Sequence, residues 1–463
     1  SRISFILSQF GSTQYRDVGP IHKRHTVSLS TLADSRPIES RDTLVSYFQA
    51  GCKDPDQVLI GTEHEKFGWC PKTFQRPAYE PKGIKATLEG FVQFGWTPIH
   101  EGDVLVGLKR DRATITLEPG GQLELSGAPV RLVSETAREF DDHIKELSAL
   151  DVDLGWSGLG YFPAGTAERA PLMPKPRYKI LEAYLRSVGG AGLDMMRQTC
   201  TVQVNLDYLN EVDAMRKLRL GLLVHPMVIA LFANSRMVEG EWGAYASQRA
   251  VVWETTAPER TRLPDTFYRA GARFEDYVEW SLSAPMLFIH RNDAYVDCRG
   301  LSFKDFIRDG FNGSAATVGD YALHLSTLFP DVRLKHYLEI RGADMGGRTD
   351  VLALPALFKG LFYGPASLDS LDRLFTHVTP AASRQAALSA ARDGLEGRLL
   401  DRPLRDWAAE VIQIAKSGLK ALEPSALKYL DGLWNNAERR NHRDATAGFN
   451  ADQLLLDSDL LSL

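Results

Sequence analysis

Hydrophobic and polar residues alternate with a period of two along several stretches of the chain, a pattern typical of β-strands with one buried face. Longer segments with apolar residues at helical spacing separate several of these stretches, and Pro403–Leu422 is the clearest of them. This order predicts an α+β fold in which helices cover the apolar face of a mainly antiparallel sheet and leave a polar, concave face opposite. The alternating stretches are Val58–Phe67, the paired arms Ala113–Glu118 and Gln122–Ser126, Thr201–Tyr208, and Leu334–Arg341.

The polar face of the first stretch carries two carboxylates. Side chains of a strand alternate between faces, so Glu63 and Glu65 share one face and His64 points to the other. We therefore interpret His64 as a packing residue rather than a ligand. Two carboxylates on one face repel each other unless a cation or a cationic ligand lies between them, so this stretch is a candidate binding site. An ordinary solvated sheet face is the alternative.

The paired arms are predicted to form a hairpin that turns at the Pro-Gly-Gly sequence of residues 119–121. In that hairpin Glu118 lies opposite Gln122, and Thr116 lies opposite Glu124. Opposite residues share a face, as do residues two apart, so all four side chains line one face while leucines occupy the other. The hairpin therefore adds two glutamates to the polar side of the sheet.

The last two alternating stretches extend the polar face. One presents Gln203 and Asn205, and the other places Lys335, Glu339 and Arg341 on one side. Because Glu339 and Arg341 are two residues apart, a metal ligand and a phosphate-binding guanidinium can lie side by side. An ion pair within one strand is the alternative.

Glutamates dominate this face, and few cations accompany them. Like charges on one face destabilise a fold unless a cation offsets them. Oxygen ligands without a cluster of cysteine and histidine favour Mg²⁺, with Mn²⁺ as the alternative, over zinc. We therefore predict a magnesium site, of the kind that bridges to nucleotide phosphates. Its candidate ligands are Glu63, Glu65, Glu118, Glu124 and Glu339.

Two arginines outside the sheet are candidates for binding a substrate carboxylate. Arg177 and Arg249 are predicted to lie in loops, where a guanidinium can form forked hydrogen bonds with a carboxylate. For each of them, an ordinary surface arginine is the alternative.

The composition is that of a globular protein and narrows the range of partners. Of the 463 residues 44% are hydrophobic and 24% are charged, and the net charge of −5 argues against a nucleic-acid or membrane-surface protein. The longest apolar run, Leu218–Ala233, contains Arg219, His225 and Pro226, so it predicts a buried core helix rather than a membrane span. The four cysteines form no C-x-x-C pair, which predicts reduced thiols in a cytoplasmic protein.

Candidate chemistry is confined to the middle of the chain. Residues 1–40 are polar and basic in places, and we expect a partly disordered N-terminal extension. Residues 41–365 contain every candidate site residue and are predicted to be the catalytic core. Residues 366–463 are helical in pattern and carry few chemically suggestive residues, so we expect a helical region that packs on the core.

Five long motifs coincide with these candidates. They are I-G-T-E-H-E-K-F-G at 60–68, L-E-P-G-G-Q-L-E-L-S-G-A-P at 117–129, C-T-V-Q-V-N-L-D at 200–207, A-L-F-A-N-S at 230–235 and V-R-L-K-H-Y-L-E-I-R-G-A-D at 332–344. The chain thereby resembles glutamate–cysteine ligase of the type found in plants and many proteobacteria. The resemblance begins near Arg41 and reaches the C-terminal helices.

The resemblance implies a glutamine-synthetase-like catalytic fold whose antiparallel sheet, of about six strands, forms a bowl. It also implies the first step of glutathione synthesis. ATP would phosphorylate the γ-carboxylate of L-glutamate, and the amine of L-cysteine would then attack the γ-glutamyl phosphate. We expect these small molecules as the only partners, without nucleic acid or membrane, and a monomer or a homodimer.

The resemblance further implies roles for individual residues. The five glutamates would be the magnesium ligands, and Arg341 would stabilise the transferring phosphoryl group. Arg177 and Arg249 match positions that hold the glutamate carboxylate, and Trp253 and Met196 would pack along the substrate. The residues expected to contact ATP are Gln203, Asn205 and Lys335.

The chain departs from the plant pattern at its cysteines and near the acceptor site. Cys298 matches a plant regulatory cysteine, but residues 311–314, where its partner is expected, contain none. The second plant pair falls on Leu352 and Ala137, so neither disulfide can form as in plants and we predict little thiol-redox control. Leu287 stands where the plant sequence has a tyrosine, which leaves the details of the acceptor site open.

Two other functions remain open. One is a related carboxylate–amine ligase with the same ATP chemistry and another amine acceptor. The other is a catalytically silent nucleotide- or metal-binding protein on this fold, which the five converging carboxylates disfavour because uncompensated buried charge is costly. The amine dependence of ADP release separates these alternatives.

Overall fold

A computed structural model describes residues 34–441 and 450–462, and an antiparallel sheet organises them. Every pair of neighbouring strands is antiparallel, which confirms the predicted fold class. The sheet has nine strands, where about six were expected, and it does not close into a barrel. In spatial order the strands are β12 (Val332–Leu334), β13 (Leu338–Asp344), β7 (Thr201–Leu206), β1 (Ile60–Trp69), β5 (Leu123–Ser126), β4 (Ala113–Leu117), β3 (Val104–Arg110) and β2 (Thr97–Glu101), with β6 (Gly155–Ser157) paired to the end of β1.

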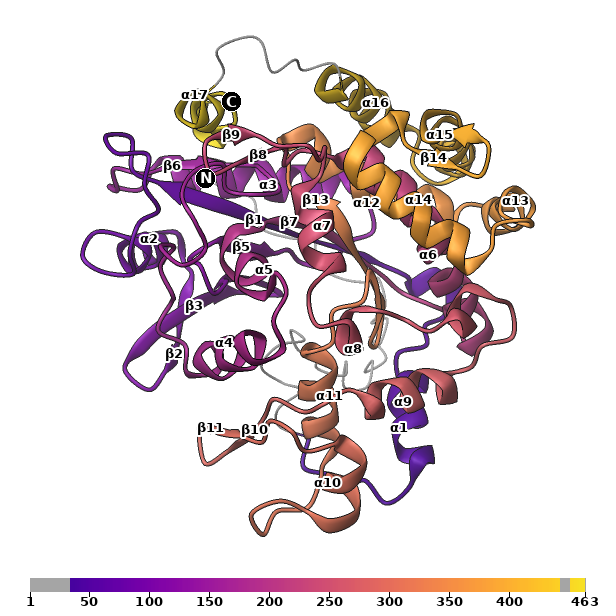
Figure 1. The fold of residues 1–463 in the computed structure, drawn as a ribbon, viewed down its shortest axis with the longest axis horizontal. Helices are drawn as coiled ribbons and strands as arrows, with labels where there is room; N and C mark the ends of the chain where they lie inside the picture. Colours follow the sequence, from indigo (N-terminus) through magenta and orange to yellow (C-terminus); the bar gives the residue numbers. More distant parts are fainter. Residues whose placement is uncertain (1–33, 442–449, 463) are drawn as a thin grey trace, which may run out of the picture.

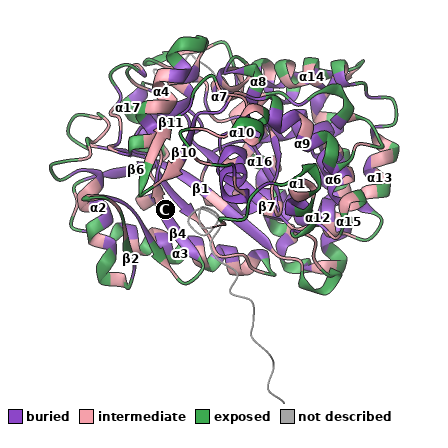
Figure 2. Cartoon of the chain, turned by 90° about the horizontal axis from the view of Figure 1, so that it is seen from below, coloured by how far each residue is buried: buried purple, intermediate pink, exposed green. Residues whose placement is uncertain are grey.

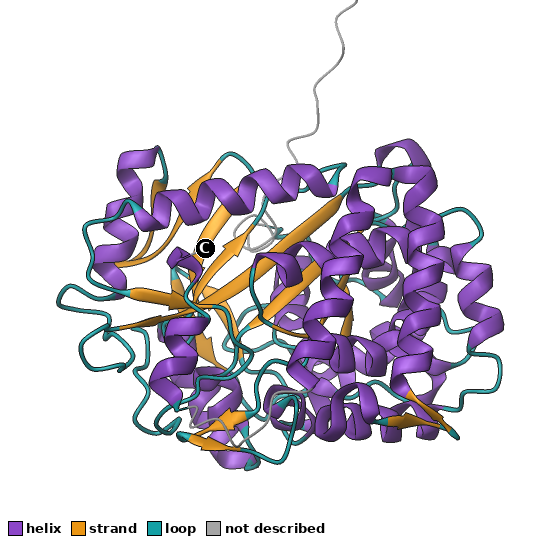
Figure 3. Cartoon of the chain, turned by 90° about the horizontal axis from the view of Figure 1, so that it is seen from above, coloured by secondary structure: helices purple, strands orange, loops and turns teal. Residues whose placement is uncertain are grey.

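Helices cover the apolar face of the sheet, and Figure 3 shows most of them gathered at one end of the molecule. The helices that pack on the central strands include α3 (Val133–Ser148), α6 (Glu211–Phe232) and α12 (Arg348–Tyr363). α6 is the predicted buried helix, and it passes through Pro226 without a break. Outside them lie α14 (Pro380–Asp393), α15 (Leu404–Leu422) and α16 (Leu427–Asn441).

One hydrophobic core joins the sheet to the C-terminal helices, since its buried residues run from Ile38 to Leu460. Figure 2 shows burial concentrated on the central strands and the helices against them, and exposure along the rim. The C-terminal helices therefore share the core of the sheet, while a domain boundary at residue 365 stays a prediction.

Shorter elements surround the polar face of the sheet (Figure 1). They are α4 (Pro176–Val188), α5 (Gly192–Gln198), α7 (Gln248–Glu254), α8 (Pro258–Thr261), α11 (Val318–Ser326) and the hairpin of β10 (Phe288–Arg291) and β11 (Ala294–Asp297). The remaining helices are α1 (Arg41–Gln49), α2 (Ile84–Phe91), α9 (Phe274–Ser283), α10 (Phe303–Asp309), α13 (Ser367–Leu374) and α17 (Ala451–Asp457). Two small strand pairs are β8 (Met237–Val238) with β9 (Glu241–Trp242) and β14 (Arg398–Leu399) with β15 (Arg402–Pro403). Short 3₁₀ helices span Pro55–Gln57, Val92–Phe94, Asp265–Tyr268, Gly394–Glu396, Pro424–Ala426 and Leu460–Ser462.

The structure corrects two sequence predictions. Leu334–Arg341 is not one strand, because residues 335–337 form the turn between β12 and β13. His336 leaves the sheet there and stacks on Tyr47, with the ring centroids 4.1 Å apart. The candidate arginines of residues 177 and 249 lie on α4 and α7 rather than in loops.

The expected N-terminal extension falls largely on residues 1–33, which lie outside the described residues. The rest of it, residues 34–40, packs on the start of α11. Ile38 donates a backbone hydrogen bond to Ala316 at 3.1 Å, and Val318 donates one to Arg36 at 2.9 Å. This segment therefore forms one end of the folded unit.

No single helix within residues 34–441 and 450–462 is long and apolar enough to cross a membrane. The bent pair of α12 and α13, which meet at 93°, passes the length and composition test only when taken together. α12 is filled with buried residues of the common core.

Candidate active site

A cavity of about 1010 Å³ lies on the polar face of the sheet. All the site candidates from the sequence line it, as does Leu287. The structure thus brings together residues from β1, β5, β7, β13 and three helices, although their individual roles remain predictions. The lining candidates are Glu63, Glu65, Glu118, Glu124, Glu339, Arg177, Arg249, Arg341, Lys335, Gln203, Asn205, Trp253 and Met196.

The register of the central strands explains this convergence. β1 lies between β5 and β7, and it pairs Glu65 with Glu124 on one side and Glu63 with Gln203 on the other. Directly paired residues of antiparallel strands project from the same face. His64 projects from the opposite face and packs on Phe140 with ring centroids 5.1 Å apart, so it is a packing residue as predicted.

Glu65, Glu118 and Glu124 form an acidic cluster that has no ion-pair partner among the described residues. Glu65 accepts a hydrogen bond from the backbone of Thr201 at 2.9 Å, and Glu124 accepts one from the Ser126 hydroxyl at 2.5 Å. Burial, followed by repulsion from Glu118 and Glu124, raises the pKa of Glu65 well above its usual range. Burial and Glu118 likewise raise the pKa of Glu124 to about 7. Arg249 and Lys175 offset only part of this repulsion, so the ionised cluster remains short of positive charge.

Glu63 continues the acidic wall towards β7. It accepts a hydrogen bond from Asn205 Nδ2 at 2.6 Å, while burial, Glu124 and Glu339 raise its pKa to about 7. Gln203 Oε1 and Asn205 Oδ1 are buried, and neither has a hydrogen-bond partner in the described part of the chain. Buried acceptor oxygens that lack donors, beside uncompensated carboxylates, suit a bound cation.

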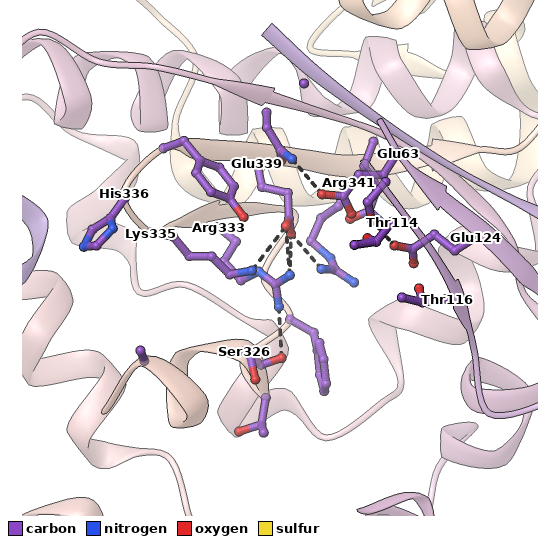
Figure 4. Close-up of a pocket in the computed structure, with 18 of the residues that line it drawn as sticks. Glu63, Thr114, Thr116, Glu124, Ser326, Arg333, Lys335, His336, Glu339 and Arg341 are labelled. Carbon is purple, nitrogen blue, oxygen red and sulfur yellow. Dashed lines mark hydrogen bonds and ion pairs between the residues drawn. The ribbon is translucent and has the colours of Figure 1, made fainter. Parts of the chain in front are cut away.

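Glu339 has the opposite surroundings, as Figure 4 shows. Its carboxylate lies 2.7 Å from Arg333, 2.9 Å from Arg341 and 3.6 Å from Lys335. Burial alone would raise the pKa of Glu339, but these three cations outweigh burial and hold its pKa well below the usual range. Arg333 was not among the predicted site residues, although a turn at residues 335–337 pairs it directly with Glu339.

The glutamates fit a divalent metal by charge and by donor type, but they do not form one compact ligand set. Among the residues the structure describes, no three acidic, histidine or cysteine side chains lie close enough together to hold an ion. The assignment of all five glutamates as metal ligands therefore stays a prediction.

The two candidate arginines reach the cavity from its helical walls. Arg249 donates from Nη2 to the backbone carbonyl of Arg341 at 2.7 Å, and its Nε is buried without a partner among the described residues. Arg177 lies over the ring of Tyr178 at 5.4 Å, and its Nε likewise has no partner there. The Arg341 guanidinium lies 5.2 Å from the centre of the Trp253 indole. The basic wall thus keeps hydrogen-bond donors available to a ligand.

Lys175 is a second cation that the sequence analysis missed. It is buried, donates from Nζ to the carbonyl of Leu117 at 3.0 Å, and lies close enough to lower the pKa of Glu124. Burial and the neighbouring Arg177 lower the pKa of Lys175 to about 8. The sequence feature that could have suggested Lys175 as a site residue is its position close to the candidate Arg177, between two prolines.

Comparison with known proteins identifies the family. The model of glutamate–cysteine ligase family 2 matches residues 59–433. The chain belongs to this family of ligases. Chloroplastic glutamate–cysteine ligase of Arabidopsis thaliana is 40% identical over 387 residues, which cover 82% of this chain and 74% of the relative. The Nicotiana tabacum enzyme is 38% identical over 413 residues, covering 86% and 79%. These findings confirm the resemblance drawn from the motifs.

A similar fold is found in a solved bacterial ligase. Glutamate–cysteine ligase of Francisella tularensis, solved in complex with AMP, superimposes with a TM-score of 0.55 and covers 87% of both chains. Only 12% of its residues are identical, so the likeness concerns the fold.

The expectation of a cytoplasmic protein is wrong by this comparison. The ligases of this family from Arabidopsis thaliana, Brassica juncea, Nicotiana tabacum and rice are named chloroplastic, which points to the plastid rather than the cytoplasm. Separate reduced thiols indicate a reducing environment but do not distinguish one reducing compartment from another.

The cysteines of this family member are all free thiols. Cys200 and Cys298 are buried, and burial raises the pKa of both thiols. Leu352 and Ala137, at the positions of the second plant pair, are buried core residues. Weak redox control stays a prediction, since buried thiols of raised pKa react slowly.

Proposed function

We propose that this protein joins the γ-carboxylate of L-glutamate to the amine of L-cysteine with ATP as co-substrate, the first step of glutathione synthesis. The observation that carries the proposal is the division of one cavity into an uncompensated acidic wall and a basic wall with free donors. Membership of glutamate–cysteine ligase family 2 names the substrates that such a cavity would take.

The reaction needs two bond exchanges. A γ-carboxylate oxygen of glutamate attacks the γ-phosphorus of ATP, the bond to the ADP oxygen breaks, and an acyl phosphate forms. The neutral amine of cysteine then attacks the acyl carbon and the bond to phosphate breaks. The nitrogen gives up one proton, and hydrogen phosphate leaves. Both steps gather negative charge on phosphoryl oxygens, which the two walls must orient and neutralise.

The acidic wall would hold Mg²⁺, with Mn²⁺ as the alternative. When bound, the metal neutralises phosphate charge and aligns donor and acceptor. Because Glu339 already holds three cations, it would keep the phosphate-binding charges beside the metal-binding carboxylates. The proposed metal ligands are Glu63, Glu65, Glu118, Glu124 and Glu339.

The basic wall would bind the anionic parts of both substrates. Arg341 would stabilise the transferring phosphoryl group, since a guanidinium matches the geometry of phosphate oxygens. Arg177 and Arg249 would hold the carboxylate of glutamate, with Trp253 and Met196 packed along its chain. The proposed ATP contacts are Gln203, Asn205 and Lys335.

Purified protein with ATP, Mg²⁺ and glutamate, assayed with one amine at a time, tests the proposal. Cysteine should drive ADP release far faster than alanine, glycine or 2-aminobutyrate, and mass spectrometry should find the glutamyl–cysteine dipeptide. Glu63→Gln should abolish turnover. Equal rates with every amine would favour a ligase with another acceptor. Ligand binding without turnover would favour a silent homologue, and either result would contradict the proposal.

A further inference from the structure

Asp344 is a buried carboxylate just outside the cavity, at the end of β13, and it is 2% exposed. Its oxygens accept hydrogen bonds from the backbone of Asn234 at 2.8 Å and from two hydroxyls, of Ser235 at 2.6 Å and of Ser247 at 2.8 Å. Gly160 makes room for it, since a Cβ at that position would lie 2.4 Å from Asp344 Cγ. The surroundings are therefore shaped around this carboxylate.

Each serine links Asp344 to the first turn of α7. A hydroxyl that donates its proton to the carboxylate keeps its lone pairs for backbone N–H groups. Ser235 Oγ accepts from the backbone of Arg249 at 3.2 Å, and Ser247 Oγ accepts from that of Ala250 at 3.1 Å. Ser247 is also the N-cap of the helix. One carboxylate thus holds two N–H groups of the first turn that have no partner inside the helix.

α7 carries two side chains of the cavity wall, Arg249 and Trp253, which lie one turn apart. The Arg249 guanidinium forms no ion pair with a carboxylate of the described residues, where its side chain donates a hydrogen bond to the carbonyl of Arg341. Its direction therefore depends on where the helix starts. With only seven residues, α7 cannot hold its own first turn by internal hydrogen bonds.

We propose that Asp344 is a positioning residue for the ligase reaction. Through Ser235 and Ser247 it holds the start of α7, so that Arg249 and Trp253 meet the glutamate substrate in one orientation. This inference rests on the proposed function, because glutamate is the ligand assigned to Arg249. Loss of the anchor should weaken glutamate binding more than ATP binding, because α7 reaches the phosphate-binding residues only through its contacts with Arg341.

Kinetics of matched serine variants test the anchor. Ser235→Ala and Ser247→Ala should each raise the KM for glutamate about fivefold, the fold-change that corresponds to the free energy of one lost capping hydrogen bond, with a smaller change in the KM for ATP. Ser247→Thr keeps a hydroxyl and should restore the wild-type KM. Ser302→Ala is the control, since it removes the N-cap hydroxyl of α10, no residue of which lines the cavity. Parallel rises in both KM values would overturn the proposal.

Hydrogen–deuterium exchange provides a readout that does not need turnover. Asp344→Asn puts an amide where three donors now meet a carboxylate, so residues 247–254 should exchange faster while the control helix α10 exchanges as in the wild type. Unchanged exchange at residues 247–254 would overturn the proposal, and the serine variants carry the same test if Asp344→Asn does not fold. A wild-type protein without glutamate-dependent turnover would contradict the proposed function. Hydrogen–deuterium exchange at residues 247–254 would still show whether Asp344 anchors α7.

Discussion

Glu65 and Glu339 are both buried glutamates on the same face of the same sheet, yet their pKa values move in opposite directions. Glu339 lies among Arg333, Arg341 and Lys335, so the protein itself supplies its counter-charge. Glu65 faces two other carboxylates and receives only a backbone hydrogen bond from the neighbouring strand. The protein itself therefore neutralises Glu339, whereas the charge of Glu65 needs a bound cation to offset it.

The largest effect is expected when the compensated carboxylate, Glu339, is neutralised. Glu339→Gln leaves three buried cations without their counter-ion, so the free energy of unfolding should fall by about 3–5 kcal/mol. Denaturant titration measures it. The control is Asp309→Asn, which breaks the exposed ion pair with Arg308 and should change stability little. An unchanged denaturation midpoint for Glu339→Gln would mean that the three cations do not need the Glu339 carboxylate as a counter-ion.

The uncompensated half predicts an unusual pH dependence. The raised pKa values of Glu63, Glu65 and Glu124 mean that the folded protein holds protons that the unfolded chain, with glutamate pKa values near 4.3, has released. The free energy of unfolding of metal-free protein should therefore fall by about 1–3 kcal/mol as the pH rises from 5 to 8. Saturating Mg²⁺ should remove this fall, because a bound cation favours the ionised carboxylates.

Glu65→Gln is the matched control for that titration. It removes one of the interacting charges while keeping the shape of the side chain, so the pH dependence without metal should flatten and the stabilisation by Mg²⁺ should shrink. Unfolding free energies of the metal-free wild type that rise between pH 5 and 8 would contradict the assignment of uncompensated charge.

A smaller effect is expected on the basic wall. Arg177→Lys and Arg249→Lys keep the charge but lose the forked donor pair, so the KM for glutamate should rise about tenfold, roughly 1.4 kcal/mol. Steady-state kinetics at saturating ATP and cysteine measure the change, and Arg308→Lys on the exposed face of α10 serves as the control. A change confined to the KM for ATP would reassign these arginines to the nucleotide.

The smallest expected effect concerns the thiols. Neither plant disulfide pair is present in the sequence and the four cysteines are free, so dithiothreitol should change the rate by less than about twofold. The comparison is between enzyme incubated with dithiothreitol and enzyme left in air. A severalfold loss of activity on reduction would show that a disulfide supports the active state.

The two halves of the site differed in how well the sequence predicted them. Glu63, Glu65 and Glu124 were found because alternation fixes which face a side chain takes, whatever the exact ends of the strand. Arg333 was missed because the same alternation runs on through residues 335–337, where the chain turns instead of continuing. Only the pairing of β12 with β13 brings Arg333 to Glu339.

The helices of the basic wall were harder to predict. α7 is seven residues long, too short for a clear helical period, and its best local signal was Ser247 as a cap. Its anchor, Asp344, lies nearly a hundred positions further along the chain and is brought there by β13. The distances between the five glutamates could not be predicted from the sequence either, because distances between strands depend on the fold and not on the alternation of polar and apolar residues.

The charged residues of β1 also affect how the strand pairs with its neighbours during folding. If β1 slipped by one residue against its neighbours, Glu63 and Glu65 would enter the layer that His64 now shares with Phe140, and Lys66 would face the cavity. Burying two carboxylates in that layer would destabilise the slipped register by several kcal/mol, so Glu63 and Glu65 favour the observed register. Glu63 and Glu65 thus help to fix the register of the central strand, and a variant that neutralises both would lose this discrimination together with two of the proposed metal ligands.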